Sequence, residues 1–294
     1  MSKQLSAAIF LFFFLLAGCA SASGEPQTRV TAPPSPTRLP PTNLPTVAAT
    51  QRPTHAQSPE PPASPTPSCI LPGTIEEAIV PDQGFGRELP YRIYLPPCYD
   101  ALEGGLPTLY LLHGLGGNDR SWLELGLART ADELVMDGEI PPFLIVLPWQ
   151  RAGLETEQAI IQGLLPHVEA NYRSLPGRSW RAIGGFSRGG GWAFRIGLKH
   201  PDRFYRVGLH SPGLLSGDLT SLEIWLESNR GSQKPLIWID IGEQDSLAPA
   251  AGEIRDRLDE LHINYLFQVG PGDHDAAYWS EHVVDYLAWY AARW

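Results

Sequence analysis

Six short apolar runs constrain the fold of this chain more than any other feature of its sequence. Each holds five or six residues, is rich in valine, isoleucine, leucine or aromatic side chains, and is bounded by turn residues. Continuous apolar character of this kind is typical of strands that are covered on both faces. The runs occupy residues 108–112, 143–147, 181–186, 205–210, 236–241 and 265–269.

Helical stretches lie between several of these runs. Residues 156–172 carry apolar side chains at helical spacing, although Pro166 is expected to kink or divide that helix. Two further helices are expected over residues 192–199 and 250–261. Strands that alternate with helices predict an α/β fold with a mostly parallel central sheet and helices on both faces. Residues 75–80 and 91–95, separated by a glycine-containing turn, predict an antiparallel N-terminal edge.

The N-terminal residues have the pattern of an export signal. Lys3 is followed by the apolar run AAIFLFFFLLA and by LAGC, which resembles a bacterial lipobox. Residues 1–18 are therefore expected to be a lipoprotein signal peptide and Cys19 to carry lipid; the alternative is an ordinary secretory signal in which Cys19 is incidental. Residues 19–68, rich in Pro, Thr, Ala and Ser, are expected to be an extended tether, and residues 69–294 the folded domain.

Charge and cysteine content narrow the class of protein. The formal net charge is −10 and the domain contains no basic run, so nucleic acid is not an expected partner. If Cys19 is lipidated, Cys69 and Cys98 remain as a pair for which an oxidising compartment permits a disulfide; two free thiols are the alternative. No clustered His and Cys ligand set is present, so neither a metal nor a cofactor is implied.

One serine stands among five glycines in GGFSRGGG, residues 184–191. An expected strand ends at Phe186 and an expected helix follows, which places Ser187 at the join. Small residues on both sides allow a tight turn there, because they keep Cβ atoms away from the neighbouring strand and helix. Ser187 is thus predicted to be a nucleophile on a strand-to-helix elbow, rather than a polar residue in a flexible loop.

A serine nucleophile needs a base and an orienting carboxylate, and candidates for both follow later strands. Asp245 lies after the run at 236–241 and His274 after the run at 265–269, so both are expected at carboxyl ends of parallel strands, where such sheets build their sites. Glu243 is a second choice for the acid. Asp273 and Asp275 flank His274 and are expected to cap the turn.

Acyl transfer also needs donors for an oxyanion. The backbone N–H of Arg188, next to the nucleophile, is one candidate, and that of Leu115 in the glycine-rich turn HGLGG is the other. His113, which begins this turn, is expected to brace the loop. The Arg188 side chain brings a positive charge that attracts an acidic substrate or pairs with a neighbouring carboxylate, and the ion pair is the favoured expectation.

Several aromatic residues are candidates for lining a substrate pocket. Core packing is at least as strong an expectation for each tryptophan. The candidates are Trp122, Trp149, Trp192, Trp279 and His210.

Separate motifs occur along the domain in a fixed order: RIYLPPCYD, YLLHGLGGNDRSW, VEANYR, GGFSRGG, HPDRF, GEQD and GDHDAAYW. Together they resemble the esterase family of α/β-hydrolases that includes esterase D or S-formylglutathione hydrolase, feruloyl esterases, enterochelin esterase-like enzymes and mycolyltransferases. The resemblance implies a triad of Ser187, Asp245 and His274 that hydrolyses carboxylic esters through an acyl-enzyme. Two positions depart from the family pattern. Arg188 follows the nucleophile, where the family often has methionine, and PWQRAG follows the expected strand 143–147, where many relatives have an aspartate.

The sequence as a whole predicts an extracytoplasmic serine esterase that is tethered to a membrane by its N-terminal lipid and acts on small-molecule or glycan esters. Two other functions remain open. One is an acyltransferase of envelope lipids or glycans, in which an alcohol replaces water; the other is a non-catalytic binding protein on the same fold. Plant-wall esters, peptide or siderophore esters and glycolipids all fit the predicted chemistry.

Overall fold

A computed structural model of the chain describes residues 71–229, 231 and 233–294. The predicted signal peptide, the tether, Cys19 and Cys69 lie outside these residues. Cys98 is disulfide-bonded, and the chain's other two cysteines, Cys19 and Cys69, are both outside the described part. The pairing of Cys98 with Cys69 therefore stays a prediction.

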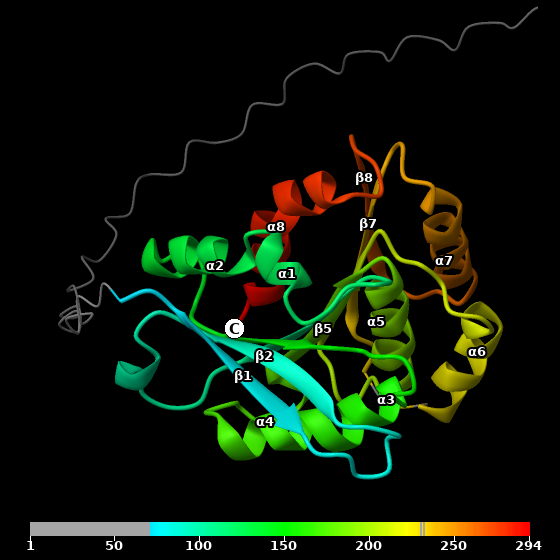
Figure 1. Cartoon of the computed structure of the whole chain (residues 1–294). Coiled ribbons are helices and arrows are strands. Elements are labelled where there is room, and N and C mark those ends of the chain that lie inside the picture. Colours follow the sequence, from blue (N-terminus) through cyan, green and yellow to red (C-terminus); the bar gives the residue numbers. More distant parts are fainter. Residues whose placement is uncertain (1–70, 230, 232) are drawn as a thin grey trace, which may run out of the picture. The chain divides into compact units, whose positions relative to one another are not determined.

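Eight strands form one sheet in the order β1-β2-β4-β3-β5-β6-β7-β8. β2 runs antiparallel to both of its neighbours, and every other pairing is parallel. This confirms the mostly parallel sheet and the antiparallel N-terminal edge (Figure 1). The strands are β1 (Thr74–Val80), β2 (Leu89–Leu95), β3 (Thr108–Leu112), β4 (Leu144–Pro148), β5 (Arg181–Phe186), β6 (Arg206–His210), β7 (Leu236–Gly242) and β8 (Tyr265–Gly270).

Helices cover both faces of the sheet, as expected. The α-helices are α1 (Ser121–Glu124), α2 (Leu127–Met136), α3 (Thr156–Gln158), α4 (Leu165–Asn171), α5 (Arg188–Lys199), α6 (Asp218–Ser228), α7 (Ala248–Glu260) and α8 (Ala276–Ala291). Short 3-10 helices occupy η1 (Tyr99–Ala101) and η3 (Arg178–Trp180), and η2 (Ala159–Leu164) is a π-helix. The sequence patterns did not identify α2 and α6, whose packing depends on the neighbours that the fold supplies.

Pro166 divides the predicted helix 156–172, as expected. It lies in the first turn of α4, where its missing N–H costs no hydrogen bond within that helix. The π-helical turn η2 comes directly before α4. The wider turn thus accommodates the break between α3 and α4 without ending the helical path.

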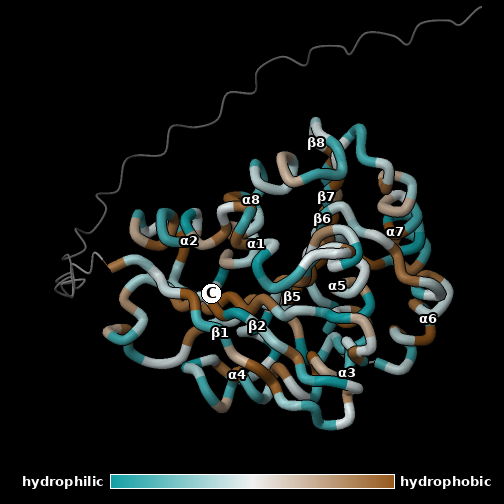
Figure 2. Tube along the Cα trace, viewed as in Figure 1, coloured by the Kyte–Doolittle hydropathy of each residue, from teal (hydrophilic) through white to brown (hydrophobic). Residues whose placement is uncertain are grey.

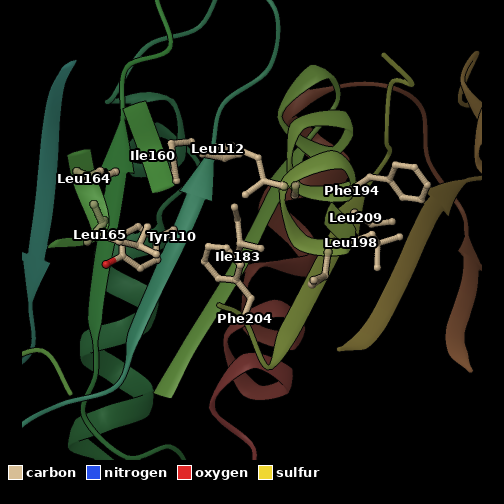
Figure 3. Close-up of a cluster of buried hydrophobic side chains, with 14 of the residues drawn as sticks. Tyr110, Leu112, Ile160, Leu164, Leu165, Ile183, Phe194, Leu198, Phe204 and Leu209 are labelled. Atoms are coloured by element: carbon tan, nitrogen blue, oxygen red, sulfur yellow. The ribbon is translucent and has the colours of Figure 1, made fainter. Parts of the chain in front are cut away.

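Two buried apolar clusters, one on each face, hold the helices to the sheet. One joins η2, α4, α5 and α7 to the strands, and Figure 3 shows part of it around Tyr110, Ile183 and Phe194. The other joins α1, α2 and α8 to the opposite face. In Figure 2 hydrophobic residues gather along the central strands, whereas α7 carries hydrophilic residues on its outer side. Burial on both faces explains why the strands read as continuous apolar runs.

Within the described residues no helix combines the length and the apolar character needed to cross a membrane.

Candidate active site

Ser187 occupies the sharp turn between β5 and α5. Its backbone has φ 55° and ψ −126°, a strained conformation for a residue with a Cβ atom. Its N–H donates to the carbonyl of His210 at 3.0 Å, and its carbonyl accepts from the N–H of Gly213 at 2.9 Å. The end of β6 and the loop after it therefore hold the serine in this conformation.

The glycines around Ser187 are required by close approaches of the backbone. A Cβ atom on Gly185 would lie 2.5 Å from the carbonyl carbon of Gly189, and one on Gly189 would collide with the carbonyl groups of Leu112 and His113. These opposing atoms belong to the backbone and cannot rotate away. The turn can therefore bring α5 against the ends of β3 and β5 only without side chains at these two positions.

We expect Gly189→Ala to lower the free energy of unfolding by about 2 to 3 kcal/mol, because the added methyl group overpacks against fixed backbone. Gly252→Ala is the matched control. It lies inside α7 with only the tip of Arg255 as near as 4.0 Å to the new methyl group, so we expect a gain of about 0.5 to 1 kcal/mol. Urea denaturation of both variants measures the difference; equal effects would contradict the steric argument.

His274 and Asp245 lie in line with Ser187. His274 Nε2 is 2.9 Å from Ser187 Oγ, and its Nδ1 is 3.0 and 2.9 Å from Asp245 Oδ1 and Oδ2. Asp245 is 4% exposed and also accepts from the N–H of Leu247 at 2.7 Å. The structure thus brings together the three residues predicted as nucleophile, base and acid, in the geometry that proton transfer from a serine hydroxyl requires.

Hydrogen bonds join the two loops that carry Asp245 and His274. Glu243 N–H donates to the Gly270 carbonyl at 2.8 Å, and Gln244 N–H donates to the Gly272 carbonyl at 2.9 Å. Gln244 Oε1 accepts from Gly272 N–H at 3.1 Å. The loops after β7 and β8 are therefore fixed to each other, and the carboxylate and imidazole share this support.

The competing carboxylates have other positions. Glu243 is exposed, and the acid in contact with His274 is Asp245. Asp273 accepts from the N–H of His274 at 2.7 Å, and Asp275 caps α8 by accepting from the N–H of Tyr278 at 3.0 Å. The expected turn-capping roles of Asp273 and Asp275 agree with these contacts.

The turn after β3, which contains Leu115, comes next to Ser187. Gly114 approaches so closely that a Cβ atom on it would lie 3.3 Å from Ser187 Cβ. Gly117 N–H donates to the Gly114 carbonyl at 3.2 Å, which closes a turn around Leu115, whose side chain is 77% exposed. The Arg188 amide belongs to the first turn of α5, where helix N–H groups have no partner within the helix.

His113 braces this turn, as the sequence predicts. Gln150 N–H donates to His113 Nε2 at 3.0 Å, so the ring proton is on Nδ1, which donates to the Gly114 carbonyl at 2.8 Å. Burial lowers the pKa of His113, and the nearby charge of Arg188 acts in the same direction. The neutral ring thus links the loops after β3 and β4. Gln150 was not among the predicted site residues; its only sequence signal is its position directly after β4.

Two of the residues predicted to line a pocket belong to the core instead. Trp122 is 1% exposed and donates from Nε1 to the Leu112 carbonyl at 3.1 Å. His210 is fully buried and bonds through Nδ1 to Asp240 at 2.5 Å. Both side chains pack beneath the site, on the face covered by α1 and α8, because α8 brings its aromatic residues over the end of β6. The pocket role is therefore wrong for Trp122 and His210, whereas the alternative of core packing is confirmed for Trp122.

The other three tryptophans lie in different surroundings. Trp279 stacks on Phe186 with ring centroids 4.4 Å apart and presents its ring edge-on to His274 at 5.0 Å. Trp149 is half-exposed after β4, and the half-buried Trp192 packs against the core. Trp279 thus supports the imidazole, whereas pocket roles for Trp149 and Trp192 stay predictions.

The expected ion pair of Arg188 does not form. Among the described residues no carboxylate pairs with its guanidinium, which instead donates from Nη2 to the Gln150 carbonyl at 3.5 Å. This contact directs the side chain toward the loop after β4. No group of three or more His, Cys, Asp or Glu side chains suited to a metal ion occurs in the same described part of the chain.

The fold and the elbow that carries Ser187 define an α/β-hydrolase. Residues 83–290 match the family model described as "Putative esterase". The chain belongs to this esterase family.

Curated relatives match part of the chain. The endo-1,4-beta-xylanase/feruloyl esterase of Xylanibacter ruminicola is 30% identical over an aligned length of 158 residues, and the match covers 48% of this chain and 22% of that protein. An esterase of Mycobacterium tuberculosis is 27% identical over 214 residues, 65% of this chain and 44% of that protein. The chain therefore spans less than half the length of these relatives.

Solved structures share the fold. A ferulic acid esterase superposes with a TM-score of 0.67 at 23% identity, covering 76% of this chain and 98% of that one. A fluorophosphonate-binding serine hydrolase of Staphylococcus aureus superposes with a TM-score of 0.64 at 22% identity, covering 74% and 98%. Identities this low show the α/β-hydrolase fold alone.

Proposed function

We propose that this chain is a serine esterase that hydrolyses carboxylic esters through an acyl-enzyme at Ser187. The observation that carries the proposal is the hydrogen-bonded line from Ser187 Oγ through the His274 ring to Asp245. Membership of the esterase family supports the same reaction class. A serine hydroxyl becomes an effective nucleophile when a positioned base accepts its proton.

In the first half-reaction, Ser187 Oγ attacks the ester carbonyl while its proton passes to His274 Nε2. The Asp245 carboxylate accepts a hydrogen bond from Nδ1 and stabilises the imidazolium that forms. The backbone N–H groups of Leu115 and Arg188 stabilise the negative oxygen of the tetrahedral intermediate. The C–O bond to the alcohol then breaks, and His274 gives its proton to the departing oxygen.

In the second half-reaction, water attacks the acyl-enzyme. His274 Nε2 accepts a proton from this water, and a second tetrahedral intermediate forms at the same pair of amides. The bond to Ser187 Oγ breaks, the serine takes the proton back from His274, and the carboxylic acid leaves. An alcohol in place of water would give acyl transfer, so the nature of the acceptor separates an esterase from an acyltransferase.

Labelling with a fluorophosphonate, followed by mapping of the modified residue, tests this assignment. We expect one labelled site, at Ser187, and turnover of short 4-nitrophenyl esters with release of free acid, because the imidazole activates only this serine. Product analysis with added sugar or glycolipid shows whether an alcohol competes with water. Labelling elsewhere, or no turnover of any ester, would refute the proposed esterase.

We also propose an extracytoplasmic, lipid-anchored location. The support is the export-signal pattern of residues 1–18, the LAGC motif that ends at Cys19 and the proline-rich composition of residues 19–68. Metabolic labelling with a fatty acid, compared between the natural chain and Cys19→Ala, tests the anchor. Equal labelling of the two proteins would rule it out.

A further inference from the structure

Arg188 carries a charge beside Ser187 that has no counter-charge in the described part of the chain. Its one hydrogen bond is the long contact to the Gln150 carbonyl, and its Nε is buried without a partner. Three other half-buried or buried arginines are better satisfied. Arg181 pairs with Glu169 and Arg195 with Asp218, and Arg206, which has no carboxylate partner in that same part of the chain, donates to two backbone carbonyls. A partly buried cation loses hydration that no anion replaces here, so an incoming anion would stabilise the Arg188 side chain.

The outer end of this guanidinium is open. Among residues 71–229, 231 and 233–294 Nη1 has no hydrogen-bond acceptor, and it is not one of the buried polar atoms without a partner, so solvent reaches it. Nη1 and Nη2 together form the planar pair of donors that binds a carboxylate through two parallel hydrogen bonds. The open edge of Arg188 therefore fits a carboxylate in both charge and shape.

The loop that Arg188 reaches has further unsatisfied polar groups. Gln150 is 4% exposed, and both polar atoms of its side-chain amide are buried with no partner in the part of the chain that the structure describes. Buried polar groups of this kind are rare in folded proteins and call for a water or ligand to complete them. Since His113 is held neutral beside them, Arg188 supplies the positive charge at this point.

The direction of the side chain indicates which part of an ester would meet it. The sheet order places β4 and β3 on one side of β5, and β6, β7 and β8 on the other. His274, which follows β8, must face the alcohol oxygen to protonate it. The acyl part then extends away from His274, toward the ends of β3 and β4, where Arg188 meets Gln150.

We propose that Arg188 forms an anion subsite in the acyl part of the pocket, so that this chain prefers esters whose acyl chain ends in a carboxylate. The proposal rests on the proposed hydrolysis at Ser187 and adds the substrate class. The reacting atoms and proton transfers are unchanged, because the guanidinium binds the remote carboxylate and takes no part in bond breaking.

Two matched esters test the subsite: mono-4-nitrophenyl glutarate, whose acyl chain ends in a carboxylate, and its neutral methyl ester. We expect the ratio of their kcat/KM values, anionic over neutral, to fall by about tenfold to a hundredfold in Arg188→Met, the range of a charge-assisted hydrogen-bonded pair. Arg188→Lys should keep part of the preference, and higher ionic strength should lower the ratio in the natural protein.

Arg255→Met is the control, since Arg255 is an exposed arginine of α7 that pairs with Asp256; we expect it to leave the ratio unchanged. Background hydrolysis, including attack by the ester's own carboxylate, is measured with Ser187→Ala and subtracted. A ratio in Arg188→Met equal to that of the natural protein would overturn the anion subsite.

Binding of glutarate, measured by calorimetry, tests the subsite without catalysis. We expect Arg188→Met to weaken this binding by at least about tenfold. If the natural protein cleaves no ester, the proposed esterase fails while this measurement still decides the subsite. Equal binding by the two proteins would overturn it.

Discussion

Replacing Ser187 with alanine is expected to lower kcat for ester hydrolysis by a factor of about 10⁵ or more, the scale on which removal of a serine nucleophile acts. Without Oγ there is no atom that His274 can activate, although the amides of Leu115 and Arg188 would still bind the substrate carbonyl. The residual rate should therefore be that of water attack at a preorganised oxyanion site. Steady-state kinetics with a 4-nitrophenyl ester measure the loss of kcat, and fluorophosphonate labelling measures the loss of the reactive serine.

The stability of Ser187→Ala separates loss of the nucleophile from loss of the fold. Alanine has the same Cβ atom and meets the same backbone strain at φ 55°, and the variant loses one side-chain hydrogen bond to His274. We expect the free energy of unfolding to change by no more than about 1 kcal/mol. Ser228→Ala, at the exposed end of α6, should keep full activity. An active Ser187→Ala would refute the triad.

The sheet could be predicted because its strands are buried on both faces and therefore read as apolar runs. The elbow was visible for a related reason, since Gly185 and Gly189 are fixed by steric contacts that leave no other residue. The positions of Asp245 and His274 followed from the rule that parallel sheets build their sites at the carboxyl ends of strands. Each of these inferences depends on local backbone geometry.

Side-chain neighbours in the core could not be predicted in the same way. Trp122 and His210 belong to segments that lead to the site, but their side chains pack beneath it. Their partners there are tyrosines of α8, more than 70 residues away in the sequence. One signal was present: Gly184 and Gly208 are register partners on β5 and β6, and a Cβ atom on either would collide with the Tyr290 hydroxyl. The paired glycines thus mark where an aromatic residue of α8 contacts the sheet.

Arg188 shows the same limit at the site itself. An ion pair with a neighbouring carboxylate was the favoured expectation for Arg188, but the sequence does not determine which residue lies within reach of one guanidinium. Its neighbours are set by the ends of β3 and β4, which present the ring of His113 and the carbonyl of Gln150. The unpaired charge is therefore visible only in the folded chain.

Asp240 is expected to be the aspartate on which the stability of the domain depends most. It is fully buried in β7 and bonds to His210 Nδ1, while its Oδ2 accepts from the hydroxyls of Tyr278 at 3.1 Å and Tyr286 at 2.7 Å. Burial raises the pKa of both tyrosines, and the charge of Asp240 acts in the same direction. The two hydroxyls thus stay protonated and act as donors.

Asp240→Ala should lower the free energy of unfolding by about 4 kcal/mol, because three buried donors lose their acceptor together. Asp245→Ala is the matched comparison, because it also removes an aspartate bonded to a histidine. His274 is half-exposed, so water can solvate its ring in this variant. We therefore expect Asp245→Ala to cause a small loss of stability and a large loss of kcat. Urea denaturation and ester kinetics on both variants separate the two roles. Similar stability losses in Asp240→Ala and Asp245→Ala would mean that the buried pair of Asp240 and His210 does not hold α8 to the sheet.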